Sequence, residues 1–365
     1  MLRKFPRPIK RVVVKVGSSV IANYKMAPEK SRLGSLIKQL SDATKNGIEV
    51  VLVSSDAIIL GMVELDLRFR PTDLSSLQAL AAVGQTILMS SYSGLFKQNQ
   101  TKCAQILLTW DDFNDRARYN NARHTFQALL SQSVVPVVNE NDTIATDEIK
   151  FTDNDRLSAL VACLVHADLL LILSDVEGLY DASTGDKKIF EEVKEITPEI
   201  EGIATDTTKK HISRGGMKAK LQAIKMATAA NIPCIIANAE KENVFSRVLA
   251  GERIGTLFVE KEEKGLARKH WISFGAQPKG SVTVDDGARA ALLKGGKSLL
   301  LPGVVGWDGH FKSDDIVVVY DKDKKEIGRG IINYSMSDLH KAQDKNEKKG
   351  KREVIHCDNL VLSER

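Results

Sequence analysis

The segment Val12-Val-Val-Lys-Val-Gly-Ser-Ser19 is a short apolar run that ends in a glycine–serine turn. Its valines favour a buried strand. Similar runs recur between longer stretches with helical periodicity, which predicts strands at 12–16, 50–54, 105–109, 134–138, 169–173 and 234–237 and helices at 29–46, 74–98, 119–132, 155–166 and 217–230. This alternation predicts an α/β fold, with a mainly parallel sheet sandwiched by helices. Ligands on such sheets bind beyond the carboxyl ends of the strands.

The pattern changes after about residue 260, where a charged stretch is followed by short β-like runs interrupted by glycine. We therefore predict an α/β domain at 1–260, a linker at 261–270 and a small β-rich domain at 271–365. The last of these contains 16 basic and 14 acidic residues, a net charge of +2. Because nucleic-acid binding relies on a pronounced basic surface, we do not expect RNA to be the main partner of this domain.

Composition narrows the class of protein. The chain has 365 residues, 43% of them hydrophobic, and a net charge of +5, which excludes an intrinsically disordered chain and a dedicated nucleic-acid binder. Its four cysteines lie far apart without metal-ligand spacing, so we expect a reducing, cytoplasmic location. Nothing resembles a signal peptide or the ~20 apolar residues of a membrane span. The absence of GxGxxG, HExxH and CxxC motifs leaves no basis for a dinucleotide-dependent dehydrogenase or a zinc hydrolase.

Two strand ends carry polar groups. Lys15 lies within the first valine run, where a buried ammonium needs an anionic partner, although a strand-end lysine in solvent is an equally plausible interpretation. The glycine–serine turn after it suits phosphate binding. Ser55 follows the second strand in Ser54-Ser55-Asp56, which could donate hydrogen bonds to a carboxylate or phosphate, or form an ordinary turn.

The segment 139–155, Asn-Glu-Asn-Asp-Thr-Ile-Ala-Thr-Asp-Glu-Ile-Lys-Phe-Thr-Asp-Asn-Asp, holds six carboxylates in seventeen residues. It could be a polar loop in which Asp153 or Asn154 caps the next helix. It could instead bind a substrate ammonium, or order lysines and Mg²⁺ around a phosphate. Asn139 and Asp142 come just after an apolar strand, which favours the functional interpretation.

The segment Ser213-Arg-Gly-Gly-Met-Lys-Ala-Lys220 opens a predicted helix with three cations and two glycines. Cations are unfavourable in the first turn of a helix, whereas helix N-termini and glycine amides bind phosphate. A bound anion would account for both features. The alternative is a solvated charge cluster.

Taken together, these segments resemble the glutamate 5-kinase branch of the amino acid kinase family, followed by a PUA domain. The resemblance rests on Val14–Ser19, Ala81-Ala-Val-Gly-Gln85, Arg118-Tyr-Asn-Asn-Ala-Arg123, the acidic segment, Leu173-Ser-Asp-Val-Glu-Gly-Leu-Tyr-Asp181 and Gly215-Gly-Met217 with Lys220. It implies ATP-dependent phosphorylation of the side-chain carboxylate of L-glutamate, the first step toward proline. It also implies a homo-oligomer, feedback inhibition by proline, and delivery of the product to glutamyl-phosphate reductase.

The resemblance assigns roles to individual residues. Lys15 and Lys220 would neutralise the transferring phosphoryl group, and Asp155 would hold both lysines. Ser55, Asp142 and Asn154 match the glutamate-binding positions. The ATP-binding positions, besides Lys15, are Ser174, Asp175, Arg214, Gly215, Gly216, Met217, Lys218, Ala219 and Lys220. Mg²⁺ would arrive with ATP, without a dedicated protein site.

Two positions depart from the family pattern. Asp56 stands where the family usually has glycine, and it adds a negative charge beside anionic ligands. Arg214 follows Ser213 where the family usually has Gly-Thr, and arginine can still bind phosphate. Two alternatives therefore stay open: a catalytically impaired regulatory relative whose substrate site Asp56 has closed, and a kinase for another small acid.

Overall fold

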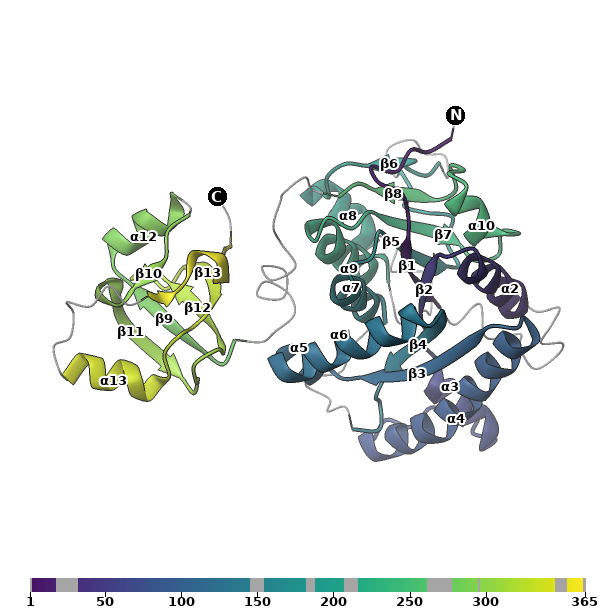
Figure 1. Cartoon of the computed structure of the whole chain (residues 1–365), viewed down its shortest axis with the longest axis horizontal. Coiled ribbons are helices and arrows are strands. Elements are labelled where there is room, and N and C mark those ends of the chain that lie inside the picture. Colours follow the sequence, from purple (N-terminus) through teal and green to yellow (C-terminus); the bar gives the residue numbers. More distant parts are fainter. Residues whose placement is uncertain are drawn as a thin grey trace. The chain divides into compact units, whose positions relative to one another are not determined.

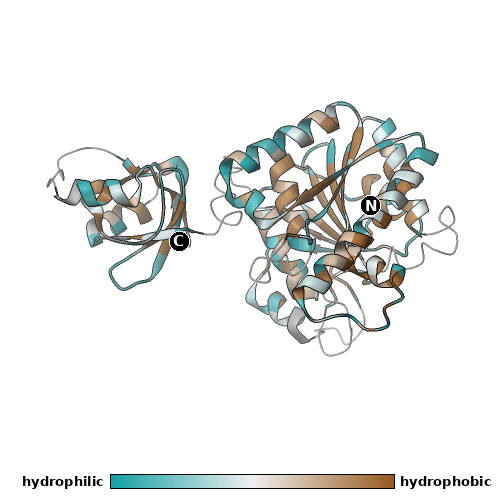
Figure 2. Cartoon of the chain, turned by 90° about the horizontal axis from the view of Figure 1, so that it is seen from below, coloured by the Kyte–Doolittle hydropathy of each residue, from teal (hydrophilic) through white to brown (hydrophobic). Residues whose placement is uncertain are grey.

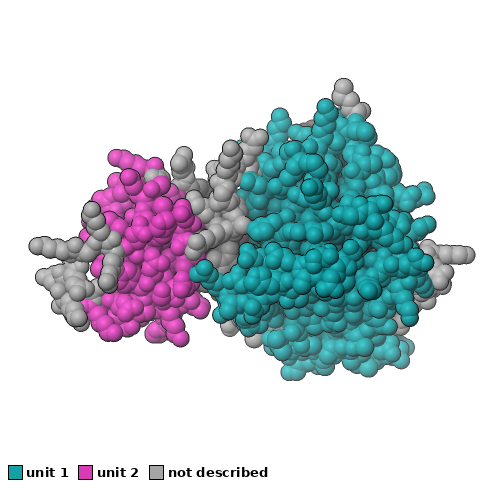
Figure 3. All heavy atoms as spheres, in the orientation of Figure 1, with its two compact units in different colours: residues 1–263 teal, residues 264–365 magenta. Residues whose placement is uncertain are grey.

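The computed structural model describes residues 2–17, 32–144, 154–181, 188–206, 216–260, 278–294, 296–344 and 353–363. The chain forms two compact units, residues 1–263 and 264–365, drawn in two colours in Figure 3. The predicted linker at 261–270 lies outside the described residues. Among the described helices, none combines the length and apolarity that a membrane span requires.

Unit 1 is built on one eight-stranded sheet with the order β3-β4-β2-β1-β5-β7-β8-β6. All neighbouring strands run parallel except β7 and β8, so the predicted mainly parallel sheet is confirmed. The six predicted strands form within three residues of their expected bounds. The strands are β1 (Arg11–Val16), β2 (Glu49–Val53), β3 (Lys102–Leu108), β4 (Val134–Glu140), β5 (Leu169–Ser174), β6 (Glu192–Val193), β7 (Cys234–Asn238) and β8 (Thr256–Phe258).

Helices cover both faces of this sheet (Figure 1). Successive valines of β1 point to opposite sides: Val13 belongs to one apolar core, and Val12 and Val14 belong to the other. Figure 2 shows the resulting hydrophobic strands between helices. The first core is covered by α6 (Arg116–Ser131), α7 (Asn154–Val165) and α9 (Met217–Ala229), and the second by α2 (Arg32–Lys45), α4 (Leu74–Gln98) and α10 (Val244–Leu249).

Among the described residues of unit 1, four short helices were not predicted: α3 (Ala57–Glu64), α5 (Trp110–Asn114), α8 (Pro198–Asp206) and α10. Of these, α3 packs unusually closely on α4. A Cβ atom on Gly84 would lie 1.7 Å from the carbonyl oxygen of Ala57, and one on Gly61 would lie 2.0 Å from that of Leu80. Only glycine permits such an approach, so this helix pair fixes where the chain leaves β2.

Unit 2 has a five-stranded sheet with the order β11-β9-β12-β13-β15 and a separate β10–β14 pair. Its apolar core includes Val282, Val317 and Ile355. The predicted β-rich domain is confirmed, and within the described part of unit 2 two α-helices accompany the sheet. The elements are β9 (Gly280–Val284), α12 (Asp286–Leu293), β10 (Leu299–Leu300), β11 (Val304–Gly309), β12 (Ile316–Tyr320), β13 (Glu326–Ile331), α13 (Met336–Asp344), β14 (Glu353–Ile355) and β15 (Leu360–Leu362).

Candidate active site

Two buried lysines share one buried aspartate at the carboxyl end of the central strands. Lys15 Nζ lies 2.7 Å from Asp155 Oδ1, and Lys220 Nζ lies 3.3 Å from Asp155 Oδ2. Asp155 is fully buried, and the two lysine side chains are 8% and 9% exposed. The solvent-facing interpretation of Lys15 is therefore wrong, and Lys220 does not belong to a solvated cluster.

Three elements bring this ion triad together. Lys15 stands near the end of β1, while Asp155 and Lys220 stand in the first turns of α7 and α9. Burying three charges is unfavourable unless they are paired, and this arrangement leaves one positive charge in excess. The positive ends of the α7 and α9 dipoles add to it. The cluster therefore suits a strongly anionic ligand group.

Asn154 links the triad to the end of β2. Its Nδ2 atom donates to the main-chain oxygen of Ser54 at 2.6 Å and to Asn139 Oδ1 at 3.1 Å. Asn154 begins α7 and uses its side chain for these long-range bonds, so helix capping alone does not describe it. Ser55 is adjacent: its hydroxyl lies 3.4 Å from the Val16 carbonyl oxygen. Two of the three predicted glutamate-binding residues thus lie near the carboxyl end of β2: Ser55 follows this strand, and Asn154, at the start of α7, contacts Ser54.

Asp56 occupies an unusual position beside Ser55. Its backbone is left-handed, with φ of 82° and ψ of 13°, a region that favours glycine and that aspartate tolerates better than most residues. Its carboxylate Oδ2 lies 3.2 Å from the Ser55 hydroxyl. Burial raises the pKa of Tyr92, the charge of Asp56 raises it further, and the hydrogen bond with Ser54 opposes both. The charge of Asp56 therefore acts on Tyr92, whose hydroxyl bonds that of Ser54.

The described nucleotide-binding candidates lie at the end of β5 and at the start of α9. Ser174 ends β5, next to β1, and its hydroxyl donates to Asp175 Oδ1 at 3.0 Å. Gly17 lies close to the lysine, because a Cβ there would lie 3.9 Å from Lys15 Nζ. Gly216 is the N-cap of α9, followed by half-buried Met217, exposed Lys218 and half-buried Ala219.

Arg214 and Gly215 lie outside the described residues, as does most of the acidic segment. Asp142 is half-buried in the turn after β4. Conversely, Gln85 and Tyr92, both on α4, reach the site without having been singled out: Gln85 accepts from Asn139 at 2.9 Å, and Tyr92 bonds the Ser54 hydroxyl at 2.8 Å. The segment Ala81–Gln85, on which the family resemblance partly rests, was the sequence signal that could have identified Gln85.

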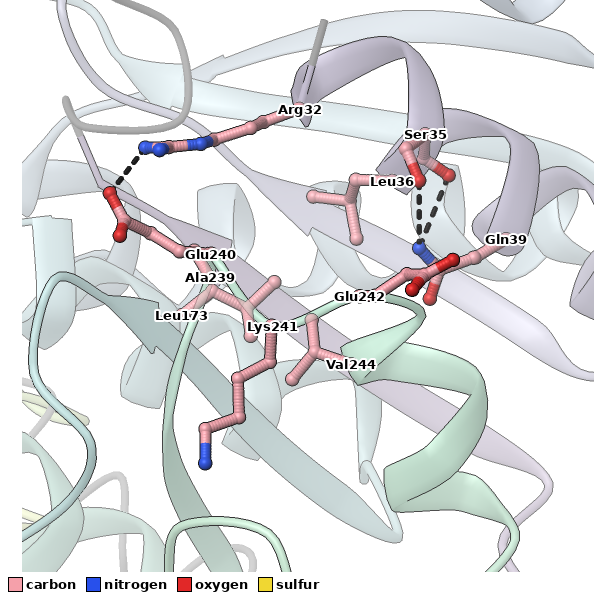
Figure 4. A pocket seen from close by; sticks show the side chains of 10 residues that line it. All are labelled: Arg32, Ser35, Leu36, Gln39, Leu173, Ala239, Glu240, Lys241, Glu242 and Val244. Carbon is pink, nitrogen blue, oxygen red and sulfur yellow. Dashed lines mark hydrogen bonds and ion pairs between the residues drawn. The ribbon is translucent and has the colours of Figure 1, made fainter.

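A separate cavity of about 80 Å³ lies on the α2 side of the sheet, at the ends of β5 and β7 (Figure 4). An ion pair between Arg32 and Glu240 lies at this cavity, and Gln39 donates to Ser35. A space of this volume has room for a few water molecules, whereas ligand pockets usually measure about 300–1,000 Å³. It is too small to be the nucleotide site.

Comparison with known proteins identifies the family. Residues 10–238 match the model of the amino acid kinase family. The chain belongs to this family. Residues 280–354 match the model of the PUA domain, so the β-rich unit 2 is a C-terminal PUA domain.

Relatives within the amino acid kinase family extend over nearly the whole chain. A protein of Dictyoglomus thermophilum named glutamate 5-kinase is 46% identical over 368 residues, which is 98% of both chains. A second, from Carboxydothermus hydrogenoformans and of the same name, is 43% identical and covers 99% of this chain and 100% of that one. Carbamate kinase from Giardia lamblia bound to AMP-PNP has a similar fold, with a TM-score of 0.50, 20% identity, and coverage of 69% of this chain and 99% of that chain.

Proposed function

We propose that this protein transfers the γ-phosphoryl group of ATP to the side-chain carboxylate of L-glutamate, forming γ-glutamyl 5-phosphate as the first step of proline biosynthesis. The proposal rests on the buried Lys15–Asp155–Lys220 triad in a chain 46% identical, end to end, to a protein named glutamate 5-kinase. ATP is the phosphoryl donor expected for an amino acid kinase.

The reaction needs charge neutralisation more than proton transfer. A glutamate carboxylate oxygen forms a bond to the γ-phosphorus, the bond from that phosphorus to the bridging oxygen breaks, and ADP leaves with the electron pair. The attacking carboxylate is already ionised at neutral pH, so no general base is required. The two ammonium groups at Asp155 stabilise the negative charge of the phosphoryl group and of the leaving phosphate. Asp155 holds them in place.

Mg²⁺ fits this site as a companion of ATP. The oxygens of Asp155 are engaged by two lysines, so among the described residues we assign Asp175, beside Ser174, as a carboxylate that could contact the metal. Mg²⁺ usually keeps several waters and takes one or two carboxylates plus substrate phosphates. When bound, it would further neutralise the phosphate oxygens.

The substrate side is assigned to Ser55, Asn154 and Asp142. A hydroxyl donor suits a glutamate carboxylate, and a carboxylate and an amide oxygen suit its ammonium group. Because acids of similar shape share these groups, a kinase for another small acid is the competing possibility. A panel of L-glutamate, L-aspartate and N-acetyl-L-glutamate separates the two, since only the true substrate supports ATP turnover at low concentration.

The second candidate function is a regulatory relative that binds nucleotide without transferring phosphate. The observation that favours it is the contact between Asp56 and the Ser55 hydroxyl, which competes with a substrate carboxylate. Under this hypothesis the wild type is silent and Asp56→Gly is active.

The direct test is ATP turnover with L-glutamate and hydroxylamine, which traps an acyl phosphate as hydroxamate. Wild type is compared with Lys220→Ala, and exposed Lys218→Ala in the same helical turn serves as the matched control. We expect hydroxamate from wild type and from the control, and almost none from Lys220→Ala. A wild type that forms no hydroxamate with glutamate would refute the proposed kinase activity.

Further aspects of the proposal concern partners and location. An acyl phosphate hydrolyses readily, which favours a reductase, glutamyl-phosphate reductase, that consumes it promptly. Feedback inhibition by proline, a homo-oligomeric state and a cytoplasmic location follow from the resemblance and stay predictions. Proline added to the hydroxamate assay and light scattering of the purified protein test the first two.

A further inference from the structure

Three side-chain amides form a hydrogen-bonded chain that runs from the start of α7, across β4, to α4. Asn154 donates to Asn139 Oδ1 at 3.1 Å, and Asn139 Nδ2 donates to Gln85 Oε1 at 2.9 Å. Asn139 is 2% exposed, so water cannot readily replace a lost partner. These three amides connect Asn154, the residue next to Asp155, with α4, a helix that contributes no residue to the ion triad.

We call these three hydrogen-bonded side chains the amide relay. The main-chain oxygen of Ser54 determines which atom is the donor and which the acceptor in each of its bonds. The Ser54 carbonyl oxygen can only accept, so Asn154 must turn its Nδ2 toward it, at 2.6 Å. That nitrogen has two hydrogens, and the second goes to Asn139, which must therefore present its oxygen. The nitrogen of Asn139 then faces Gln85, which must accept. If any of the three residues reversed its side-chain amide, two donors or two acceptors would face each other and a hydrogen bond would be lost.

We infer that Gln85 is a positioning residue of the substrate site, acting through Asn139 on Asn154. The inference rests on the proposed function and deepens it. With both hydrogens of its amide engaged, Asn154 turns its side-chain oxygen away from Ser54 and Asn139. An oxygen held in that direction accepts a hydrogen bond from an ammonium group, such as that of glutamate. It has no hydrogen to donate to a carboxylate. Gln85 thus helps to select an amino acid over a plain dicarboxylic acid.

The same inference gives a physical role to the segment Ala81-Ala-Val-Gly-Gln85. Gly84 allows α4 to touch the first turn of α3, because a Cβ there would overlap the Ala57 carbonyl oxygen at 1.7 Å. The adjacent Gln85 then reaches β4. One turn of α4 therefore sets the position of the Ser55 loop and the orientation of the amide relay.

The test compares Gln85→Met, which has a similar size but no acceptor, with Gln85→Glu, whose carboxylate can accept from Asn139. Gln98→Met, an exposed position near the end of the same helix, is the matched control. In the hydroxamate assay we expect Gln85→Met to raise KM for glutamate about five- to tenfold, the equivalent of one buried hydrogen bond. KM for ATP should stay unchanged and kcat should change little. Gln85→Glu should recover most of the loss, and Gln98→Met should match wild type.

Two further measurements separate positioning from a structural role. In an Asn139→Ala background, Gln85→Met should have no additional effect on KM for glutamate, because the relay is already broken. Thermal unfolding of each variant shows whether the fold is intact, and Gln85→Ala replaces Gln85→Met if methionine prevents folding. An unchanged KM for glutamate, equal increases in both KM values, or additive effects in the double variant would overturn the inference while leaving the kinase activity standing. A wild type without glutamate-dependent turnover would overturn both.

Discussion

Replacing Asp56 by glycine should increase the affinity for glutamate. Asp56 combines two unfavourable features, a left-handed backbone with φ of 82° and a carboxylate 3.2 Å from the hydroxyl of Ser55. A glutamate carboxylate bound to that hydroxyl would have to approach a like charge. Glycine removes the charge and suits the backbone conformation.

The size of the effect follows from the geometry. With the Ser55 hydroxyl 3.2 Å from Asp56, and a typical hydrogen bond of about 2.8 Å to the ligand, the two carboxylates come within about 6 Å of each other. Asp56 is half-buried, so an effective dielectric of about 40, between the surface and bulk values, gives a repulsion of about 1.4 kcal/mol. Its removal lowers KM for glutamate about tenfold.

The assay uses hydroxamate formation with three variants. Asp56→Asn removes the charge but keeps a side chain, so it should give most of the effect of Asp56→Gly. Asp66→Gly is the backbone control, because this exposed aspartate also has a positive φ, of 53°, but follows α3 at its far end. It should leave KM unchanged. If Asp56→Gly lowers KM while Asp56→Asn does not, the backbone is responsible, and if neither does, the electrostatic reasoning is wrong.

Three other changes should have distinct outcomes. Asp155→Asn leaves two buried lysines without their shared anion, so it should lower the free energy of unfolding by about 3–5 kcal/mol, measured by urea denaturation. A loss below about 1 kcal/mol would contradict the burial argument. Lys220→Ala should lower kcat at least about 100-fold in the hydroxamate assay, with KM for glutamate less affected; an equal effect on both would argue against transition-state stabilisation. Burial raises the pKa of Cys103 to about 11. Its alkylation, followed by peptide mass mapping, should therefore be slow at pH 8 and accelerate about tenfold per pH unit up to that value. A rate that reaches a plateau near pH 9 would instead indicate an ordinary thiol.

Much of the fold is accessible from the sequence because its signals are local. The valine runs and helical periodicities depend on neighbours a few positions away, so the strand at 134–138 and the helix at 74–98 appear close to their predicted places. The short helix α3 was missed, because its eight residues include few polar positions that mark a periodicity. Within the site, Lys15 was recognisable as a charge in an apolar strand, whereas the role of Asp155 came only from the family resemblance.

The sequence by itself determined the strands, the parallel sheet and the residue types that match the family. Only the tertiary structure decided which of these residues meet. Lys15, Asp155 and Lys220 come together because β1 lies in the centre of the sheet and both α7 and α9 begin at its carboxyl edge. The relay from Gln85 to Asn154 likewise depends on the packing of α4 on β3, next to β4, which brings Gln85 within reach of Asn139. Such contacts join positions far apart in the chain, and their geometry is set by sheet order and helix packing, which no local pattern of residues encodes.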